Sequence, residues 1–452
     1  MQSIFPLLLL ELGCAPASVG AHTGSREEAD PDDSTTETAW TDSGETAVET
    51  VPGSDWSRPQ VDPDALPEGV RTVNIEIDAA AMARLDDDPF HAPDERGTFI
   101  DDDGVSHEVD LSYRGAYALL SVMSYYDLRN WKVKFDEDDP YLDRREWNYN
   151  YEPHQTAQLA FDLMRFAGVA VPEAEHVVLQ VNGVYQGVYL QYADPDDMAW
   201  LEDWFGDDGG DLYKAAYDLP YEPQCFADLT WLGDQDADYA CHYTKKTNDD
   251  ESPEDVAVLR AFLDDLNHLS DEDFDAWVEG AIDVESLISY LVVSNFIGHW
   301  DSYPQRPKNY WLYQDPHAER MVFVPWDLDG TFNPSIDGTY NKMGATAPLL
   351  YNLVESDYAP VHETEGTERP LVRRLFAQEE IQRRYLERYA ELSETILSKD
   401  YLDDRLTALS ELLEPHASAT DRARLEAAES TTRSFISLRT TRVADELEER
   451  SP

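Results

Sequence analysis

Basic residues are scarce in this chain. Its 452 residues include 34 Lys and Arg against 93 Asp and Glu, which gives a formal charge of −59. Nucleic-acid binding requires a basic surface, so this composition argues against nucleic acid as a partner, and it argues equally against contact with an anionic membrane face. A nucleotide site in such a chain would be a local exception, in which cations or metal ions offset the negative surroundings.

Long apolar segments are also missing, because no run approaches the ~20 residues that a membrane-spanning helix needs. A short apolar run at residues 4–10 precedes Leu12-Gly13-Cys14, which is typical of an export signal with a lipoprotein-type cysteine. We expect residues 1–20 to direct export and Cys14 to carry lipid. The protein would then be an extracytoplasmic lipoprotein of the cell surface or periplasm. The alternative is a secreted protein whose signal is cleaved without lipid.

Cysteine is rare, with three residues in the whole chain. If Cys14 carries lipid, Cys225 and Cys241 remain in one loop-rich segment. In an oxidising compartment we expect them to form a disulfide. Two unpaired thiols are the alternative, whereas a metal site would need more soft ligands than the adjacent His242.

The remaining composition divides the chain into a linker and a folded body. Residues 21–66 consist largely of Ser, Thr, Asp, Glu, Gly and Pro and cannot bury enough apolar surface to fold, so we expect a disordered acidic linker. An α+β fold is predicted beyond it. Residues 67–200 form a β-rich N-lobe with a helix at 156–167 and a hairpin at Asn182-Gly183. Residues 201–452 form a mainly helical C-lobe, with an acidic insertion at about 215–250.

Helical patterns dominate the end of the chain. Asp283 is positioned to cap a helix that runs to about Phe296, and further helices are expected at 371–397, 403–413 and 421–448. These helices carry core stripes and predict no functional role.

The stretch at residues 295–333 carries the chemistry. Its apolar-aromatic runs at 310–313 and 321–324 have strand composition, and Asp315-Pro316 opens the turn between them. A β-hairpin brings its two outer ends together. The polar residues that flank this hairpin should therefore lie in one place.

Three carboxylates and one carboxamide flank the hairpin: Asp301, Asn309, Asp327 and Asp329. Carboxylates packed together repel unless a cation lies among them. Oxygen ligands suit Mg²⁺ or Mn²⁺ rather than zinc. A carboxylate loop, a hairpin and a metal-binding Asp is the layout of the catalytic half of a protein kinase. The alternative is an ordinary acidic strand exit in a chain rich in Asp.

Two lysines lie close together in a chain that has few of them. The expected strand at residues 131–135 places Lys132 and Lys134 on one face, opposite an apolar face. Such a pair could hold nucleotide phosphates. The alternative is a solvated strand face.

The order of these motifs resembles the CotH kinase family, named for spore coat protein H, over roughly residues 70–446. The resemblance rests on the strand end at 114–115, the strand at 131–135, the hairpin at 181–189, the segment at 212–214, and the central motifs at 301, 309–313 and 324–329. The last motif is the most specific.

The resemblance implies an atypical, two-lobed protein-kinase fold that transfers the γ-phosphate of ATP to Ser or Thr of an exported protein, with Mg²⁺ or Mn²⁺. By position, Asp301 would orient or deprotonate the acceptor hydroxyl. Asp327 would bind metal with help from Asp329 and Asn309. The candidate nucleotide-binding residues are Arg114, Lys132, Lys134 and Lys214.

Two departures from the family pattern keep other readings open. Ala116-Tyr117-Ala118 replaces the usual Asn-Ser-Ser, and the Lys-rich entry to the lysine strand is reduced to residues 128–130. A surface-anchored pseudokinase with a binding or structural role is one alternative. A calcium-binding adhesin that uses the same carboxylates is another.

Overall fold

The computed structural model describes residues 58–115, 128–152, 154–215, 225–248, 255–333, 343–354 and 369–450. These residues belong to one compact unit, Val48–Pro452. The predicted export signal, the lipidation site Cys14 and most of the predicted linker lie outside the described residues, as do residues 116–118. Among the helices described, none has the length and apolar character needed to cross a lipid bilayer.

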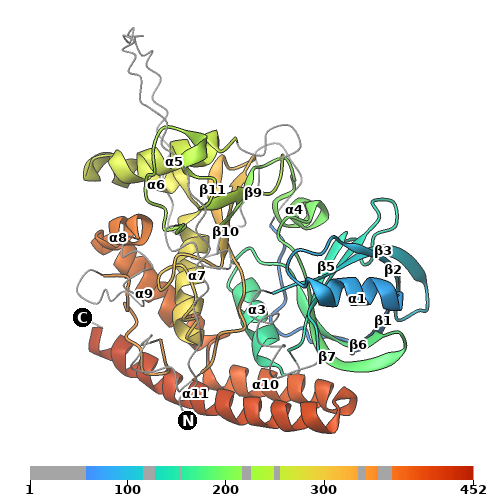
Figure 1. Cartoon of the computed structure of the whole chain (residues 1–452). Coiled ribbons are helices and arrows are strands. Elements are labelled where there is room, and N and C mark those ends of the chain that lie inside the picture. The colour runs from blue at the N-terminus through green and yellow to red at the C-terminus, as the bar shows by residue number, and fades with distance from the viewer. Residues whose placement is uncertain are drawn as a thin grey trace, which may run out of the picture. The chain divides into compact units, whose positions relative to one another are not determined.

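Seven strands close into a barrel in the first half of this unit (Figure 1). Their order is β1-β2-β3-β4-β5-β7-β6, and the parallel pairing of β1 with β6 closes the barrel. The helix α1 (Ala79–Asp87) follows β1 and packs on the barrel. The strands are β1 (Arg71–Glu76), β2 (Glu95–Ile100), β3 (Ser106–Tyr113), β4 (Trp131–Phe135), β5 (Glu146–Asn150), β6 (Ala174–Val181) and β7 (Val184–Ala193).

The barrel follows from strand periodicity. Alternate residues of β4, such as Trp131 and Val133, are buried in the barrel interior, and the residues between them face outward. The turn from β6 to β7 uses Asn182 and Gly183, both with positive φ, as a two-residue hairpin turn requires. Asn182 also accepts a hydrogen bond from the backbone of Ile77, 105 positions earlier, so the turn ties the ends of β1 and β6 together.

The second half contains a four-stranded sheet and most of the helices. The sheet order is β11-β10-β8-β9. Its strands are β8 (Leu212–Ala215), β9 (Tyr243–Lys245), β10 (Tyr310–Asp315) and β11 (Arg320–Pro325). The helices are α3 (Thr156–Phe166), α4 (Met198–Phe205), α5 (Ala257–His268), α6 (Asp271–Ala281), α7 (Val284–Ile297), α8 (Pro370–Phe376), α9 (Glu379–Glu394), α10 (Lys399–Leu413) and α11 (Ala419–Arg450).

Helix α7 is the centre of the helical part. Nearly all of its residues are buried, and it packs against α3, α9 and β11. Asp283 caps its N-terminus by accepting a hydrogen bond from the backbone N–H of Ser286 at 3.0 Å, as predicted. The helix ends at Gly298 and delivers the chain to Asp301. Figure 1 shows α10 and α11 running below both α7 and the barrel.

The mixed α+β composition with a β-rich N-terminal region confirms the α+β part of the predicted fold class. The closure of that region into a barrel was not predicted. The single helix predicted at 371–397 is wrong, because α8 and α9 are separate helices. The backbone of Gln378 is extended between them, and the side chain of Gln382 donates to the carbonyl of Phe376, which satisfies the end of α8.

The last part of the predicted linker packs on the folded body. Arg58 Nη2 lies 2.9 Å from Asp283 Oδ2, and the Tyr401 hydroxyl donates to the carbonyl of Pro63 at 2.6 Å. Val61 packs against the main core. Folded structure therefore begins ahead of Val70.

The predicted disulfide between Cys225 and Cys241 is confirmed, with their Cα atoms 5.5 Å apart. The predicted acidic insertion around it is part of the body where it is described. Residues 225–248 supply fully buried side chains such as Leu229 and Tyr239 to the main core, and β9 forms one edge of the four-stranded sheet.

Candidate active site

The hairpin of β10 and β11 brings the flanking polar residues together, as predicted. Tyr310 pairs with Pro325, and Trp326 N–H donates to the carbonyl of Asn309 at 2.9 Å. Both Asn309 and Asp327 have positive φ, at 58° and 57°. Asn and Asp tolerate this conformation better than most residues, so the chain turns sharply where it enters and where it leaves the hairpin.

Asp301 is held by three side chains from the loop before β10. Lys308 Nζ lies 2.7 Å from Asp301 Oδ2, and Asn309 Nδ2 donates to the same oxygen at 3.0 Å. Arg306 Nη1 lies 3.1 Å from the other oxygen, Oδ1. Asp301 and Lys308 are nearly buried, so these contacts fix the direction of the carboxylate.

Asp327 lies in the same electrostatic neighbourhood. Burial raises the pKa of its carboxyl, and the Asp301 carboxylate raises it further. Neighbouring cations act in the opposite direction. These cations are Lys308, Arg114 and Lys214.

Asp329 completes the carboxylate group. Loss of hydration raises the pKa of its carboxyl well above its usual range, and Asp327, Glu152 and Asp301 add to the effect. The residue keeps contact with solvent, and the three neighbouring carboxylates concentrate negative charge around it. The clustering of like charges, which the sequence predicted, is a feature of the structure.

Arg114 reaches this group from the end of β3. Its guanidinium donates to Asn150 and to the hydroxyl of Tyr192, and it lies 5.8 Å from the ring centroid of Trp326. Trp326 directly precedes Asp327. The arginine is therefore seated beside the carboxylates by contacts with β5, β7 and the exit of β11.

Lys214 reaches the group from β8. Its ammonium lies 5.0 Å from the ring centroid of Trp311, and Lys246 lies 6.0 Å from the same ring. Burial lowers the pKa of Lys214, and the charges of Lys246 and Arg114 lower it further, while Asp194 opposes them. Three cations thus gather at one place in a strongly acidic protein.

The two strand lysines have different surroundings. Lys132 Nζ lies 2.7 Å from Asp194 Oδ2 and also pairs with Glu146. Lys134, on the same outer face of β4, lies 3.0 Å from Asp94 and is more exposed. The structure thus brings Lys132, but not Lys134, to the group that contains Asp194.

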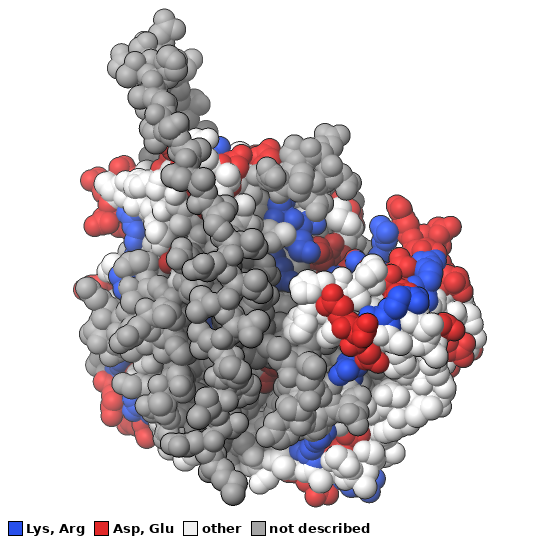
Figure 2. All heavy atoms as spheres, viewed as in Figure 1, with Lys and Arg blue, Asp and Glu red and all other residues white. Residues whose placement is uncertain are grey.

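Asp194 connects the cations. Burial would raise the pKa of its carboxyl, but neighbouring cations hold it well below its usual range; they are Lys132, Arg114 and Lys214. The carboxylate oxygens of Glu146, Asp194 and Asp196 lie within 4.8 Å of one another. Lys132 is paired with two of these residues, so this second carboxylate cluster serves to hold a cationic side chain. Figure 2 shows acidic and basic side chains next to one another in a hollow between the barrel and the four-stranded sheet.

Sequence reasoning missed several residues of this site. Lys308 stands directly before Asn309, and its charge among three nearby carboxylates was the signal that could have revealed it. Arg306 and Lys246 carry the same kind of signal. Glu152 carried no such signal in the sequence, because it follows β5, far along the chain from the central stretch. Burial and the Asp327 carboxylate raise the pKa of Glu152 to about 8.

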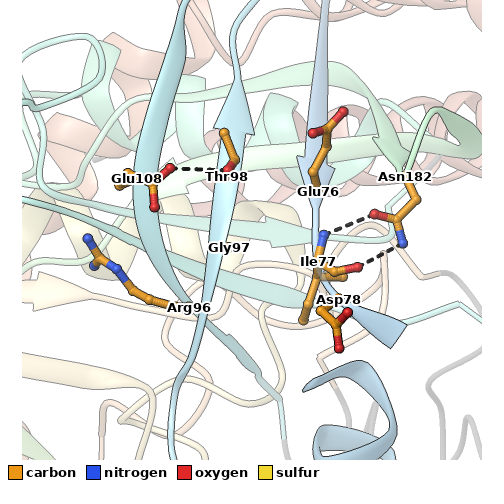
Figure 3. A pocket seen from close by; sticks show the side chains of 8 residues that line it. All are labelled: Glu76, Ile77, Asp78, Arg96, Gly97, Thr98, Glu108 and Asn182. Carbon is orange, nitrogen blue, oxygen red and sulfur yellow. Dashed lines mark hydrogen bonds between the residues drawn. The ribbon is translucent and has the colours of Figure 1, made fainter. Parts of the chain in front are cut away.

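An open cavity of about 510 Å³ lies elsewhere, on the outer wall of the barrel. Its lining residues are Glu76, Ile77, Asp78, Arg96, Gly97, Thr98, Glu108 and Asn182. Figure 3 shows that the side chain of Asn182 faces Ile77 and makes two hydrogen bonds with its backbone. The figure also shows the hydrogen bond between the side chains of Thr98 and Glu108. None of the predicted site residues lines this cavity.

Comparison with known proteins shows the family to which the chain belongs. A family model described as CotH kinase protein matches residues 111–449. The chain belongs to the CotH kinase family. The match begins within β3, so it contains every predicted site residue from Arg114 to Asp329, whereas β1, α1 and β2 precede it.

A CotH relative shows how far the likeness extends. Inner spore coat protein H of Bacillus subtilis (strain 168) is 21% identical over 312 residues, which cover 68% of this chain and 77% of that protein. The predicted membership of the CotH family is thereby confirmed, and the family is one of kinase-like proteins.

Proposed function

We propose that this protein is an exported atypical protein kinase with a kinase-like two-lobed arrangement, which transfers the γ-phosphate of ATP to Ser or Thr of an exported protein. The observation that carries the proposal is the convergence of three carboxylates with three cations. The carboxylates are Asp301, Asp327 and Asp329, and the cations are Arg114, Lys214 and Lys308.

The donor set fits a hard divalent cation. Asp327 and Asp329 offer carboxylate oxygens, and Asn309, whose amide nitrogen bonds to Asp301, offers its side-chain carbonyl oxygen. Burial and the Asp301 carboxylate raise the pKa of Asp327, and a bound cation would oppose this shift. When bound, Mg²⁺ or Mn²⁺ would neutralise the phosphate charge during transfer.

Asp301 would orient the acceptor hydroxyl and accept its proton. Because Lys308 and Arg306 contact its two oxygens from the same loop, the carboxylate is directed before substrate arrives. Phosphoryl transfer depends mainly on positioning and on electrostatic stabilisation, which such a preset carboxylate supplies.

The cations would hold the nucleotide phosphates. Arg114 and Lys214 lie beside Asp327, and Lys132 joins them through Asp194. In a protein of charge −59 they form the local exception that ATP binding requires. Lys134 lies with Asp94 instead, so of the two strand lysines we propose Lys132 as the phosphate contact.

We further propose that the protein acts outside the cytoplasm, in a coat or at a cell surface. The export signal and the lipid anchor at Cys14 that the sequence predicts support this location, as does the disulfide, and the spore coat assignment of the Bacillus relative agrees with it. Its partner would be an exported acceptor protein. Nucleic acid is not an expected partner, and membrane contact would occur through the anchor.

The direct test is incubation of the full chain with γ-labelled ATP and Mn²⁺ or Mg²⁺. We expect label on protein Ser or Thr, and we expect Asp327→Asn to abolish it. The matched control is Asp404→Asn, which changes an exposed carboxylate on α10 and should leave labelling intact.

Equal labelling of wild type and Asp327→Asn would contradict the proposed site. The absence of labelling with either metal, together with tight ATP binding, would instead support a pseudokinase. Calcium binding without ATP binding would support the adhesin reading.

A further inference from the structure

The disulfide-closed loop of residues 225–241 contacts the stretch of chain that carries Asp301 and Asn309. Ala227, Leu229 and Tyr239 have no exposed surface and belong to the main core. The loop is therefore packed into the protein rather than projecting from it.

Two tyrosines of the catalytic stretch donate hydrogen bonds to this loop. The Tyr303 hydroxyl donates to the carbonyl of Asp228 at 3.1 Å, and the Tyr310 hydroxyl donates to the carbonyl of Ala227. Tyr303 follows Asp301 by two positions, and Tyr310 directly follows Asn309. The loop thus contacts the chain on either side of the residues that hold Asp301.

The same tyrosines connect the loop to the other strand of the hairpin. The rings of Tyr303 and Tyr310 are 5.2 Å apart, and the ring of Tyr310 stacks on Phe323 of β11 at 4.5 Å. Since β11 leads directly to Asp327, a shift of Tyr310 would displace both the residues around Asp301 and those around Asp327.

The loop holds its own position through its closure and its backbone. Leu229 has a φ of 66°, its N–H donates to the Tyr243 hydroxyl at 3.1 Å, and its carbonyl accepts from Asn267 Nδ2 at 3.0 Å. The disulfide ties Cys225, at the start of the loop, to Cys241, which lies just before β9. Covalent closure restricts the conformations that the carbonyls of the loop can adopt.

We propose that this disulfide is a redox-dependent brace for the active site. When Cys225 and Cys241 are joined, the loop fixes Tyr303 and Tyr310 and, through them, the position of Asp301. This inference rests on the proposed kinase function. In forming the bridge, the two protein thiols reduce one molecule of a small disulfide such as oxidised glutathione, which gives one protein S–S bond and two small thiols.

The first test compares oxidised and dithiothreitol-reduced full chain in a Cys14→Ser background, so that the loop cysteines are the only ones present. We expect reduction to lower kcat about tenfold, because small misplacement of catalytic groups has effects of this size or larger, with KM for ATP nearly unchanged. Oxidised glutathione should restore the rate. The double variant Cys225→Ser/Cys241→Ser should be slow with or without reductant. A reduced protein that keeps the full oxidised rate would overturn the brace.

A second test removes the contact without touching the disulfide. Tyr310→Phe deletes the hydroxyl that bonds to the loop, whereas Tyr313→Phe deletes a hydroxyl on the same strand that donates to Asp207 instead, at 2.7 Å. In the oxidised protein we expect a lower kcat for Tyr310→Phe and the wild-type rate for Tyr313→Phe. If reduction unfolds the protein, the comparison of Tyr310→Phe with Tyr313→Phe replaces the reduction experiment. A wild-type rate for Tyr310→Phe then overturns the proposal.

Hydrogen exchange separates the failure of the brace from the failure of the kinase function. Reduction should increase amide exchange in residues 301–313. If neither redox state transfers phosphate, the kinase proposal fails. In that case a rise in amide exchange on reduction would still support the brace, and unchanged exchange would overturn it. If phosphate is transferred but neither rate nor exchange responds to reduction, the brace alone is wrong.

Discussion

Lys308 Nζ lies 2.7 Å from Asp301 Oδ2, although the two residues are separated by a loop of the chain. The same ammonium lowers the pKa of Asp327 and Asp329 against the effect of burial. One buried cation is therefore shared by all three carboxylates of the candidate site. Several consequences of this arrangement, and of others in the fold, can be measured.

Replacement of Lys308 should impair transfer more than binding. Lys308→Met removes the cation that directs Asp301, and loss of one preorganised electrostatic contact typically costs on the order of 100-fold in kcat. We expect such a loss, with a smaller change in KM for ATP. Lys308→Arg, which keeps the charge, should recover part of the rate in the same assay. A Lys308→Met enzyme with wild-type kcat would show that the contact is not used.

The two strand lysines should differ in their effect on ATP binding. Lys132 lies among the charges of the site, whereas Lys134 pairs with Asp94. A hydrogen bond to a charged group is worth about 1.5–3 kcal/mol, so Lys132→Met should weaken ATP binding by about tenfold or more in a calorimetric titration. Lys134→Met is the matched control and should bind ATP like the wild type. The reverse ranking would place the phosphates on the Asp94 side of the barrel.

Removal of residues 58–69 should destabilise the folded body. Their contacts include the ion pair of Arg58 with Asp283 and the hydrogen bond from Tyr401 to Pro63. Hydrogen bonds contribute about 1 kcal/mol each, so a chain that begins at Val70 should unfold with a free energy about 2 kcal/mol lower than a chain that begins at Arg58. Urea unfolding compares the two. Equal midpoints and slopes would show that the segment adds no stability.

Acid should destabilise the protein through His176. Burial lowers the pKa of this histidine to about 4 in the folded protein, whereas an unfolded histidine has a pKa of about 6.5. Between these values the unfolded chain binds a proton that the folded chain does not. The free energy of unfolding should therefore fall by up to about 1.4 kcal/mol per pH unit as pH drops from about 6.5 to 4.

The measurement is the slope of stability against pH. His176→Asn should have a shallower slope over this window, whatever its absolute stability. His91→Asn is the control, because His91 is exposed, and it should keep the wild-type slope. Identical slopes for all three proteins would refute the role of His176.

Local pattern was enough to predict the centre of the site. The β10–β11 hairpin follows from two short apolar runs and a turn, and any such hairpin places Asp301 and Asn309 near Asp327. The prediction depended only on the geometry of a hairpin, which the two apolar runs and the turn between them determine. It did not need knowledge of the rest of the fold.

Other features depend on contacts between distant segments and could not be predicted in the same way. Strand periodicity puts Lys132 and Lys134 on one face of β4, but the position of Asp194 at the end of β7 distinguishes them. Glu152 likewise follows β5, which is placed by its pairing with the distant strand β7. The short helix α1 had a local signal that was passed over, since Asp78 caps its first turn.

The parallel pairing of β1 with β6 has a consequence for biogenesis. β1 cannot pair until β6 has been made, and the bonded residues Ile77 and Asn182 at the ends of this pair are 105 positions apart. Long-range pairing of this kind slows folding. In the proposed exported protein, delayed closure of the first strand would leave time for the chain to cross a membrane before it folds.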